Sequence, residues 1–115
     1  MGVYNGFVSD ESFFCSVCGE ECDDVQEYDL GYAKWYKIGD RVDCVDKKYN
    51  GNTIAERCFY CMGKNCIEKK ERIFGYAFTE KCYIIIKNYK FIGITLSLFL
   101  AECLLDEENY YLDKE

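Results

Sequence analysis

The chain has 115 residues, which is about the size of one ordinary domain and too few for two independent hydrophobic cores. Half of the residues are hydrophobic and 17% are aromatic, so the chain has enough apolar surface to fold as one compact unit. Nine Cys and no His exclude His-dependent acid-base catalysis, Ser-His and Cys-His nucleophiles, and zinc sites that need imidazole. The net charge of −7 argues against a surface that binds a polyanion over its whole extent.

The N-terminal segment and the cysteine content predict a cytoplasmic protein. Residues 1–6 have no basic region and no apolar core of signal-peptide length. The longest uncharged stretch, residues 91–101, is much shorter than the roughly 20 apolar residues that a membrane-spanning helix needs. An odd number of cysteines without an export signal fits a reducing compartment, where thiols stay reduced or bind metal.

The first long feature in chain order is an acidic segment, residues 10–29, which has eight acidic residues and no basic one. Such a run either forms a solvated face or binds a basic partner, and both interpretations stay open. The carboxylates that we expect to bind a partner are Glu20, Glu21, Asp23, Asp24 and Glu27.

A metal knuckle lies inside this acidic segment, at Cys15-Ser16-Val17-Cys18-Gly19. Two residues between the thiolates let both sulfurs reach one ion, and the following Gly permits the tight turn that brings backbone amides near the sulfurs. A second pair, Cys58-Phe59-Tyr60-Cys61, supplies the other two thiolates of a tetrahedral site. The 39 residues between Cys18 and Cys58 can contain strands that bring both loops to one end of a sheet. We therefore predict one structural zinc per chain, bound by Cys15, Cys18, Cys58 and Cys61.

Several alternatives to this ligand set remain open at this level. Iron of the rubredoxin type uses the same four thiolates, and ordinary buried thiols need no metal at all. Cys22 and Cys66 each follow one of the pairs and can substitute for a ligand, and Cys44 can contribute to a second site. Cys82 and Cys103 sit among apolar residues, so we expect both to pack in the core.

The remaining elements are predicted from hydrophobic periodicity. Residues 32–42 contain Trp35, Tyr36 and Ile38 between charged residues, which predicts a strand ending in a turn at Gly39-Asp40. Residues 67–78 suggest further β structure. The clearest signal is the β-rich stretch from Cys82 to Ile94, whose central Lys87-Asn88-Tyr89-Lys90 predicts a hairpin turn.

One short helix is expected near the C-terminus, over residues 96–105. Its apolar residues recur at three- and four-residue steps, at Leu96, Phe99, Leu100, Cys103 and Leu104. The predicted fold is therefore mainly β, a small α+β domain with a zinc-ribbon-like sheet and one short C-terminal helix. We assign residues 1–108 to this domain and expect residues 109–115 to form a loose acidic tail, because its carboxylates would repel one another if packed.

The chain resembles a family of short phage and prophage proteins. The residues that carry this resemblance are Met1-Gly2-Val3-Tyr4, the Cys15 to Gly19 knuckle, Gln26, Ile38-Gly39-Asp40, Cys58 to Cys61 and the Cys82 to Ile94 hairpin. The resemblance implies a protein encoded by a phage or another mobile element and acting in the cytoplasm of a bacterial host cell.

The function expected from these features is non-enzymatic binding. A zinc bound by four thiolates has no open position for water, and no phosphate-binding loop or serine nucleophile motif is present. We expect a host protein with a basic surface as the partner, with the acidic segment inhibiting a nucleic-acid-targeting defence system as acidic anti-CRISPR proteins do.

Two alternative functions remain. The first is nucleic-acid binding by a basic and aromatic face over residues 64–90, with Lys69, Lys70, Arg72, Lys87 and Lys90 as its cations. The second is electron transfer by a rubredoxin-like iron site.

Overall fold

The computed structural model describes residues 5–14, 21–27, 35–43, 45, 47–60 and 79–114. Within these ranges it describes the backbone, but not the side chains, of residues 5, 9–14, 21–27, 58–60 and 79–80. The described part is mainly β with a single α-helix, which confirms the predicted small α+β class.

The first sheet has three strands in the order β2-β1-β3. Strand β1 (Asn5–Phe14) pairs antiparallel with β2 (Glu21–Glu27) and parallel with β3 (Trp35–Lys37). Gly6 lies opposite Trp35, and a Cβ atom at this position would stand 2.0 Å from the indole ring. Glycine is therefore required here for the indole to cover β1. The turn predicted at Gly39-Asp40 is present, because the Asp40 amide donates to the Lys37 carbonyl at 2.9 Å and Gly39 has a positive φ.

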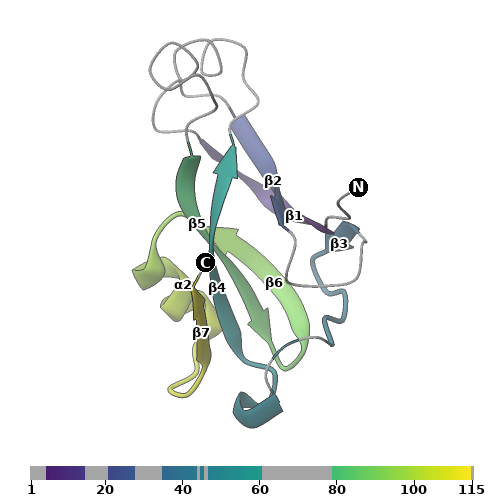
Figure 1. The fold of residues 1–115 in the computed structure, drawn as a ribbon, viewed down its shortest axis with the longest axis vertical. Coiled ribbons are helices and arrows are strands. Elements are labelled where there is room, and N and C mark those ends of the chain that lie inside the picture. The colour runs from purple at the N-terminus through teal and green to yellow at the C-terminus, as the bar shows by residue number, and fades with distance from the viewer. Residues whose placement is uncertain are drawn as a thin grey trace.

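The second sheet has four strands in the order β6-β5-β4-β7. Strand β4 (Thr53–Tyr60) follows a short 3₁₀-helix, η1 (Lys47–Tyr49), and pairs antiparallel with β5 (Thr79–Lys87). Strand β5 pairs antiparallel with β6 (Lys90–Thr95), and helix α2 (Leu98–Leu105) connects β6 to β7 (Tyr111–Lys114). Strand β7 returns parallel to β4 and forms one edge of the sheet (Figure 1).

The second sheet has a hydrophobic core on each face, because alternate residues of a strand point to opposite sides. Toward the first sheet, Phe7 stacks on Tyr36 at 4.9 Å between ring centroids and meets the edge of Phe91 at 5.0 Å. Ile84 and Ile86 of β5 and Cys82 belong to this core, which confirms the buried position expected for Cys82. On the other face, α2 covers β5 and β6. The buried residues of that smaller core are Ile54, Ile85, Ala101 and Leu105.

The hairpin predicted between Cys82 and Ile94 is confirmed. Lys87 pairs with Lys90, and the two residues between them, Asn88 and Tyr89, both have positive φ angles of 51° and 67°. Two positive φ angles in a two-residue loop match the right-handed twist of the flanking strands, and Asn tolerates this conformation well. The Asn88 amide also donates to the Asn52 side-chain oxygen at 3.0 Å, which ties the turn to the start of β4.

The expectation of a loose tail over residues 109–115 is wrong. Tyr111–Lys114 form β7, whose residues pair with Thr53 to Glu56 of β4. The acidic residue at the centre of this strand, Asp113, forms an ion pair with Arg57 of β4 at 2.8 Å. Charge neutralisation by a neighbouring strand therefore removes the repulsion that made a packed tail unfavourable.

The predicted helix exists, and the residues whose spacing indicated it are not the ones that it buries. Ala101 and Leu105 are buried and Leu98 packs beside them, whereas Phe99, Leu100 and Leu104 are exposed. Cys103 is also exposed, so the core position expected for this thiol is wrong. No helix in the described part of the chain is long and apolar enough to cross a membrane.

Candidate functional site

Four strand ends meet at one end of the molecule, and each of them adjoins a predicted metal-binding segment. Strand β1 ends at Phe14 and β2 begins at Glu21, so the chain leaves and re-enters the first sheet around residues 15–20. Strand β4 ends at Tyr60 and β5 begins at Thr79, on either side of residues 61–78. Figure 1 shows these ends at the top of the molecule, and β2 contacts β4.

Only one of the four predicted zinc ligands lies in the described backbone. Cys58 is in β4, opposite Lys81 of β5, while Cys15, Cys18 and Cys61 lie outside the described residues. Cys22 is in β2 opposite Phe13, and Cys44 and Cys66 lie outside the described residues as well. Among the side chains that are described, no group of three or more Cys, Asp or Glu is arranged to hold a metal ion. The four-Cys site therefore stays a prediction.

The structure describes the backbone of four of the five acidic residues expected to bind a partner. Glu21, Asp23, Asp24 and Glu27 belong to β2, and Glu20 lies outside the described residues. Strand β2 is at the edge of the first sheet, since its neighbour in the strand order is β1 alone. An edge strand has one row of backbone amides and carbonyls directed away from its sheet. Acidic residues on such a strand discourage pairing with other strands.

The structure describes only two of the five cations of the alternative basic face. Lys69, Lys70 and Arg72 lie outside the described residues, while Lys87 and Lys90 flank the hairpin turn. Lys87 is paired with Glu107 at 3.6 Å. Lys90 is exposed and forms a β-bridge with Arg41, whose guanidinium pairs with Asp43 and lies 4.9 Å from the centre of the Tyr89 ring. Carboxylates therefore neutralise part of this positive charge.

An ion pair between a buried arginine and an aspartate was not predicted from the sequence. The Arg57 side chain is 2% exposed, and its Nη2 lies 2.8 Å from Oδ2 of Asp113. Its Nη1 also donates to the carbonyl oxygens of Asp113 and Glu56, each at 3.0 Å. This fork joins β4 to β7. Strand alternation puts Arg57 on the buried side, but only the position of β7 shows which carboxylate meets it.

Two other titratable groups are tied to neighbouring elements. The Lys81 ammonium donates to Glu56 at 2.7 Å, and this hydrogen bond lowers the pKa of Glu56 against the opposing effect of burial. The Tyr110 hydroxyl donates to Glu102 of α2 at 2.5 Å, and burial together with this bond raises the pKa of Tyr110 to about 12. Both interactions hold elements in place.

Comparison with known proteins finds no matching family model, no similar curated protein and no similar solved structure. The resemblance to short phage proteins therefore depends on the residues quoted above.

Proposed function

We propose that this protein is a small, zinc-stabilised interaction protein that binds a basic protein partner and catalyses no reaction. The observation that carries this proposal is the common location of the four strand ends that flank the two Cys pairs. Loops that begin and end at the same pole need to extend only a short way to share one ion. The presence of Cys58 within β4 gives the site a regular backbone on one side.

A zinc bound by four thiolates suits a structural role in this fold. Four thiolates complete a tetrahedral shell, so no position is left for a reacting water. Structural zinc of this kind contributes about 10 to 16 kcal/mol of apparent binding free energy to folding. A metal between the two Cys pairs would hold together the ends of both sheets. Iron in the same four thiolates would preserve this structural role and add visible absorbance.

The charge of the protein supports a basic partner. The net charge is −7, and four of the five carboxylates expected to bind a partner belong to edge strand β2. Opposite charges across an interface increase the association rate and disfavour wrong partners. In a bacterial cell infected by a phage, a partner of this kind is a host protein that binds nucleic acid. The protein would then occupy its basic channel as an inhibitor.

The metal is tested by measuring zinc and iron in the purified protein and in single variants. Cys15→Ser and Cys58→Ser should lose the metal and much of the thermal stability, whereas Cys103→Ser should keep both because this thiol is exposed on α2. A metal-free wild-type protein, or variants that all melt like the wild type, would contradict the zinc site.

The partner is tested by capture from host lysate at low and high salt. Reversing Glu21, Asp23 and Asp24 to Lys should reduce recovery of a protein partner more than reversing Lys69, Lys70 and Arg72, with zinc content unchanged in both sets. Nucleic acid in the eluate with the opposite ranking would support the basic face instead and would refute the acidic interface.

A further inference from the structure

Helix α2 exposes a continuous apolar face. Phe99 is 71% exposed and Leu100 is 54% exposed, and they are accompanied by Leu96, Cys103 and Leu104. We call these five residues the α2 patch. Large apolar side chains exposed singly are ordinary, but five within ten residues of one helix and its N-terminal approach form a surface that water solvates poorly.

The patch is held firmly on the second sheet. The Ser97 hydroxyl accepts from the Leu100 amide at 3.3 Å and caps the first turn, and Asp106 ends the helix in the left-handed conformation with φ 52°. Leu104 passes so close to β6 that a Cβ atom at Gly93 would lie 2.9 Å from its Cδ2. Ala101 and Leu105 bury the opposite side of the helix completely. The patch is therefore presented in one orientation by a packed helix.

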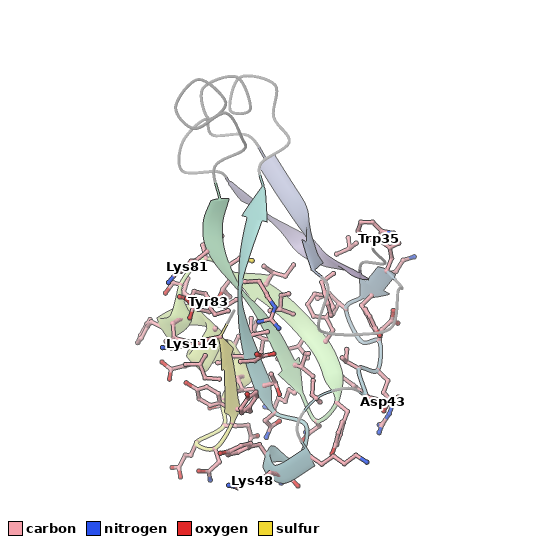
Figure 2. All side chains as sticks on the ribbon, in the orientation of Figure 1. Trp35, Asp43, Lys48, Lys81, Tyr83 and Lys114 are labelled. Carbon is pink, nitrogen blue, oxygen red and sulfur yellow. The ribbon has the colours of Figure 1, made fainter. Side chains whose placement is uncertain are left out.

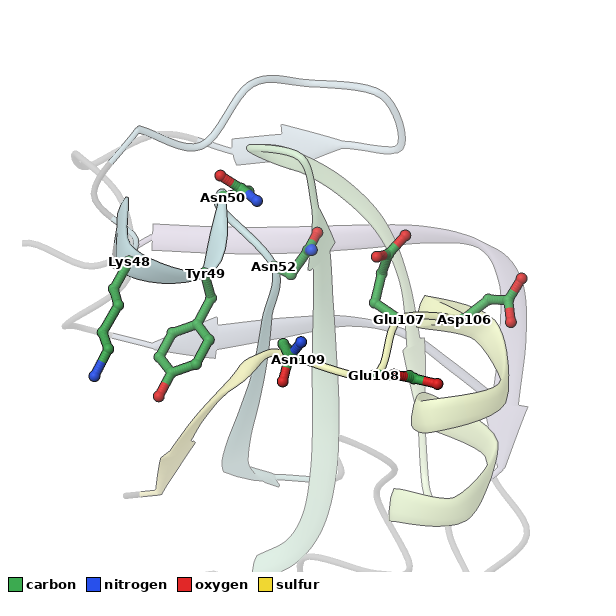
Figure 3. A pocket seen from close by; sticks show the side chains of 8 residues that line it. All are labelled: Lys48, Tyr49, Asn50, Asn52, Asp106, Glu107, Glu108 and Asn109. Carbon is green, nitrogen blue, oxygen red and sulfur yellow. The ribbon is translucent and has the colours of Figure 1, made fainter.

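An acidic pocket begins where the patch ends. Asp106, Glu107 and Glu108 follow α2 directly and line a cavity of about 690 Å³, with Lys48 and Tyr49 on its opposite side and Asn52 between the two groups in Figure 3. Glu107 pairs with Lys87, but Asp106 and Glu108 have no ion-pair partner among the described residues. From residue 96 to residue 109 the chain has four carboxylates, including Glu102, and no basic residue. Negative charge is therefore concentrated at the C-terminal end of the apolar patch.

We propose that the α2 patch and the acidic pocket form one docking site for a protein segment that has an apolar face followed by Lys or Arg. The apolar side chains of the segment would cover Phe99, Leu100 and Leu104, and a cation would enter the pocket beside Asp106 and Glu108. Complementarity of charge selects this occupant. A second copy of the chain would bring like carboxylates together, and an anionic membrane surface would be repelled by them.

This site is independent of the zinc and of the acidic strand in the proposed function. Strand β2 belongs to the sheet that packs on one face of β5, whereas α2 covers the opposite face. A single partner could span both surfaces only by wrapping around the molecule. Loss of binding at one surface can therefore be measured while binding at the other surface is intact.

The site is tested with a fluorescently labelled synthetic peptide of about 16 residues, designed as a helix with Leu along one face and with Lys and Arg directly after its last Leu. Fluorescence anisotropy should show saturable binding to the intact protein. Replacement of every Lys and Arg by Glu in the peptide, or scrambling of its sequence, should abolish binding. Bound peptide should also protect Cys103 from alkylation, which peptide mapping by mass spectrometry measures thiol by thiol.

Variants of the protein locate the binding surface. Phe99→Ser with Leu100→Ser should weaken binding by about tenfold or more without changing the melting temperature, because both side chains are exposed. Glu108→Lys should weaken binding and reduce its salt dependence. Asp43→Lys makes the same change in net charge on the far side of the molecule and should leave affinity unchanged (Figure 2).

Four outcomes would overturn the proposal. The first is that the cationic peptide does not bind, and the second is that a neutral Leu-rich peptide binds equally well. The third is that Glu108→Lys and Asp43→Lys lose the same affinity. The fourth is that sedimentation shows a concentration-dependent dimer, which Phe99→Ser dissociates. The last result would assign the patch to a second copy of the chain.

Discussion

Removing the carboxylate of Asp113 tests whether the C-terminal strand is part of the folded core. In Asp113→Ala the Nη2 of Arg57 loses a charged partner at 2.8 Å, while its bond to the residue 113 carbonyl remains possible. Arg57 itself is 2% exposed and cannot reach water without moving β7 away from β4. The substitution thus removes a carboxylate from a buried guanidinium.

The expected loss of stability follows from the burial of the two partners. Breaking a fully buried ion pair costs about 3 to 5 kcal/mol, because the remaining charge stays desolvated. The Asp113 side chain is 30% exposed, so water can reach the vacated position in part. We therefore expect a loss of about 2 to 3 kcal/mol. For a chain of this length that corresponds to a melting temperature lower by about 10 °C.

Thermal unfolding followed by circular dichroism measures this shift. The matched control is Asp43→Ala, which removes a carboxylate from Arg41 in a pair whose side chains are 62% and 58% exposed. An exposed pair contributes about 0 to 1 kcal/mol, so the control should melt close to the wild type. Arg57→Met in the Asp113→Ala background should recover part of the stability. If Asp113→Ala and Asp43→Ala melt at the same temperature, the reasoning about buried charge is refuted.

Three further predictions use the same unfolding assay. Deletion of residues 111–115 should lower the melting temperature by more than Asp113→Ala does, because β4 loses a hydrogen-bonded neighbour. An unchanged melting temperature would show that these residues form a loose tail after all. The raised pKa of Tyr110 means that the folded state holds this proton more tightly than the unfolded state, so stability should fall between about pH 10 and pH 12, and Tyr110→Phe should flatten that fall. Gly6→Ala should displace the indole of Trp35, cost about 1 to 3 kcal/mol, and shift the fluorescence of this single tryptophan, whereas an unchanged spectrum would contradict the contact.

Local signals in the sequence were sufficient for the hairpin and for the presence of the helix. Asn88 sits between two β-branched arms, and its tolerance of positive φ marks the turn without any knowledge of tertiary contacts. The helix has a serine cap and a run of apolar residues. Nearly every position of this helix is apolar, so periodicity does not distinguish the buried face of Ala101 and Leu105 from the exposed face of Phe99 and Leu104.

The strands that the sequence did not indicate depend on distant partners. Strand β2 contains acidic residues that are uncommon in strands, and it is stabilised by pairing with β1. Strand β7 carries Asp113, whose charge is acceptable only because Arg57 faces it from β4. The paired Cys-x2-Cys spacings predict metal ligands at two places along the chain, and the ends of the strands that flank these places lie at one end of the molecule in Figure 1, which the sequence does not indicate.

Native mass spectrometry of the purified full-length protein tests the central claim most directly, since it counts metal ions on the folded chain. We expect one zinc per chain, lost in Cys58→Ser and retained in Cys103→Ser. A folded protein whose mass is that of the polypeptide alone, and whose melting temperature a strong chelator does not change, would contradict it.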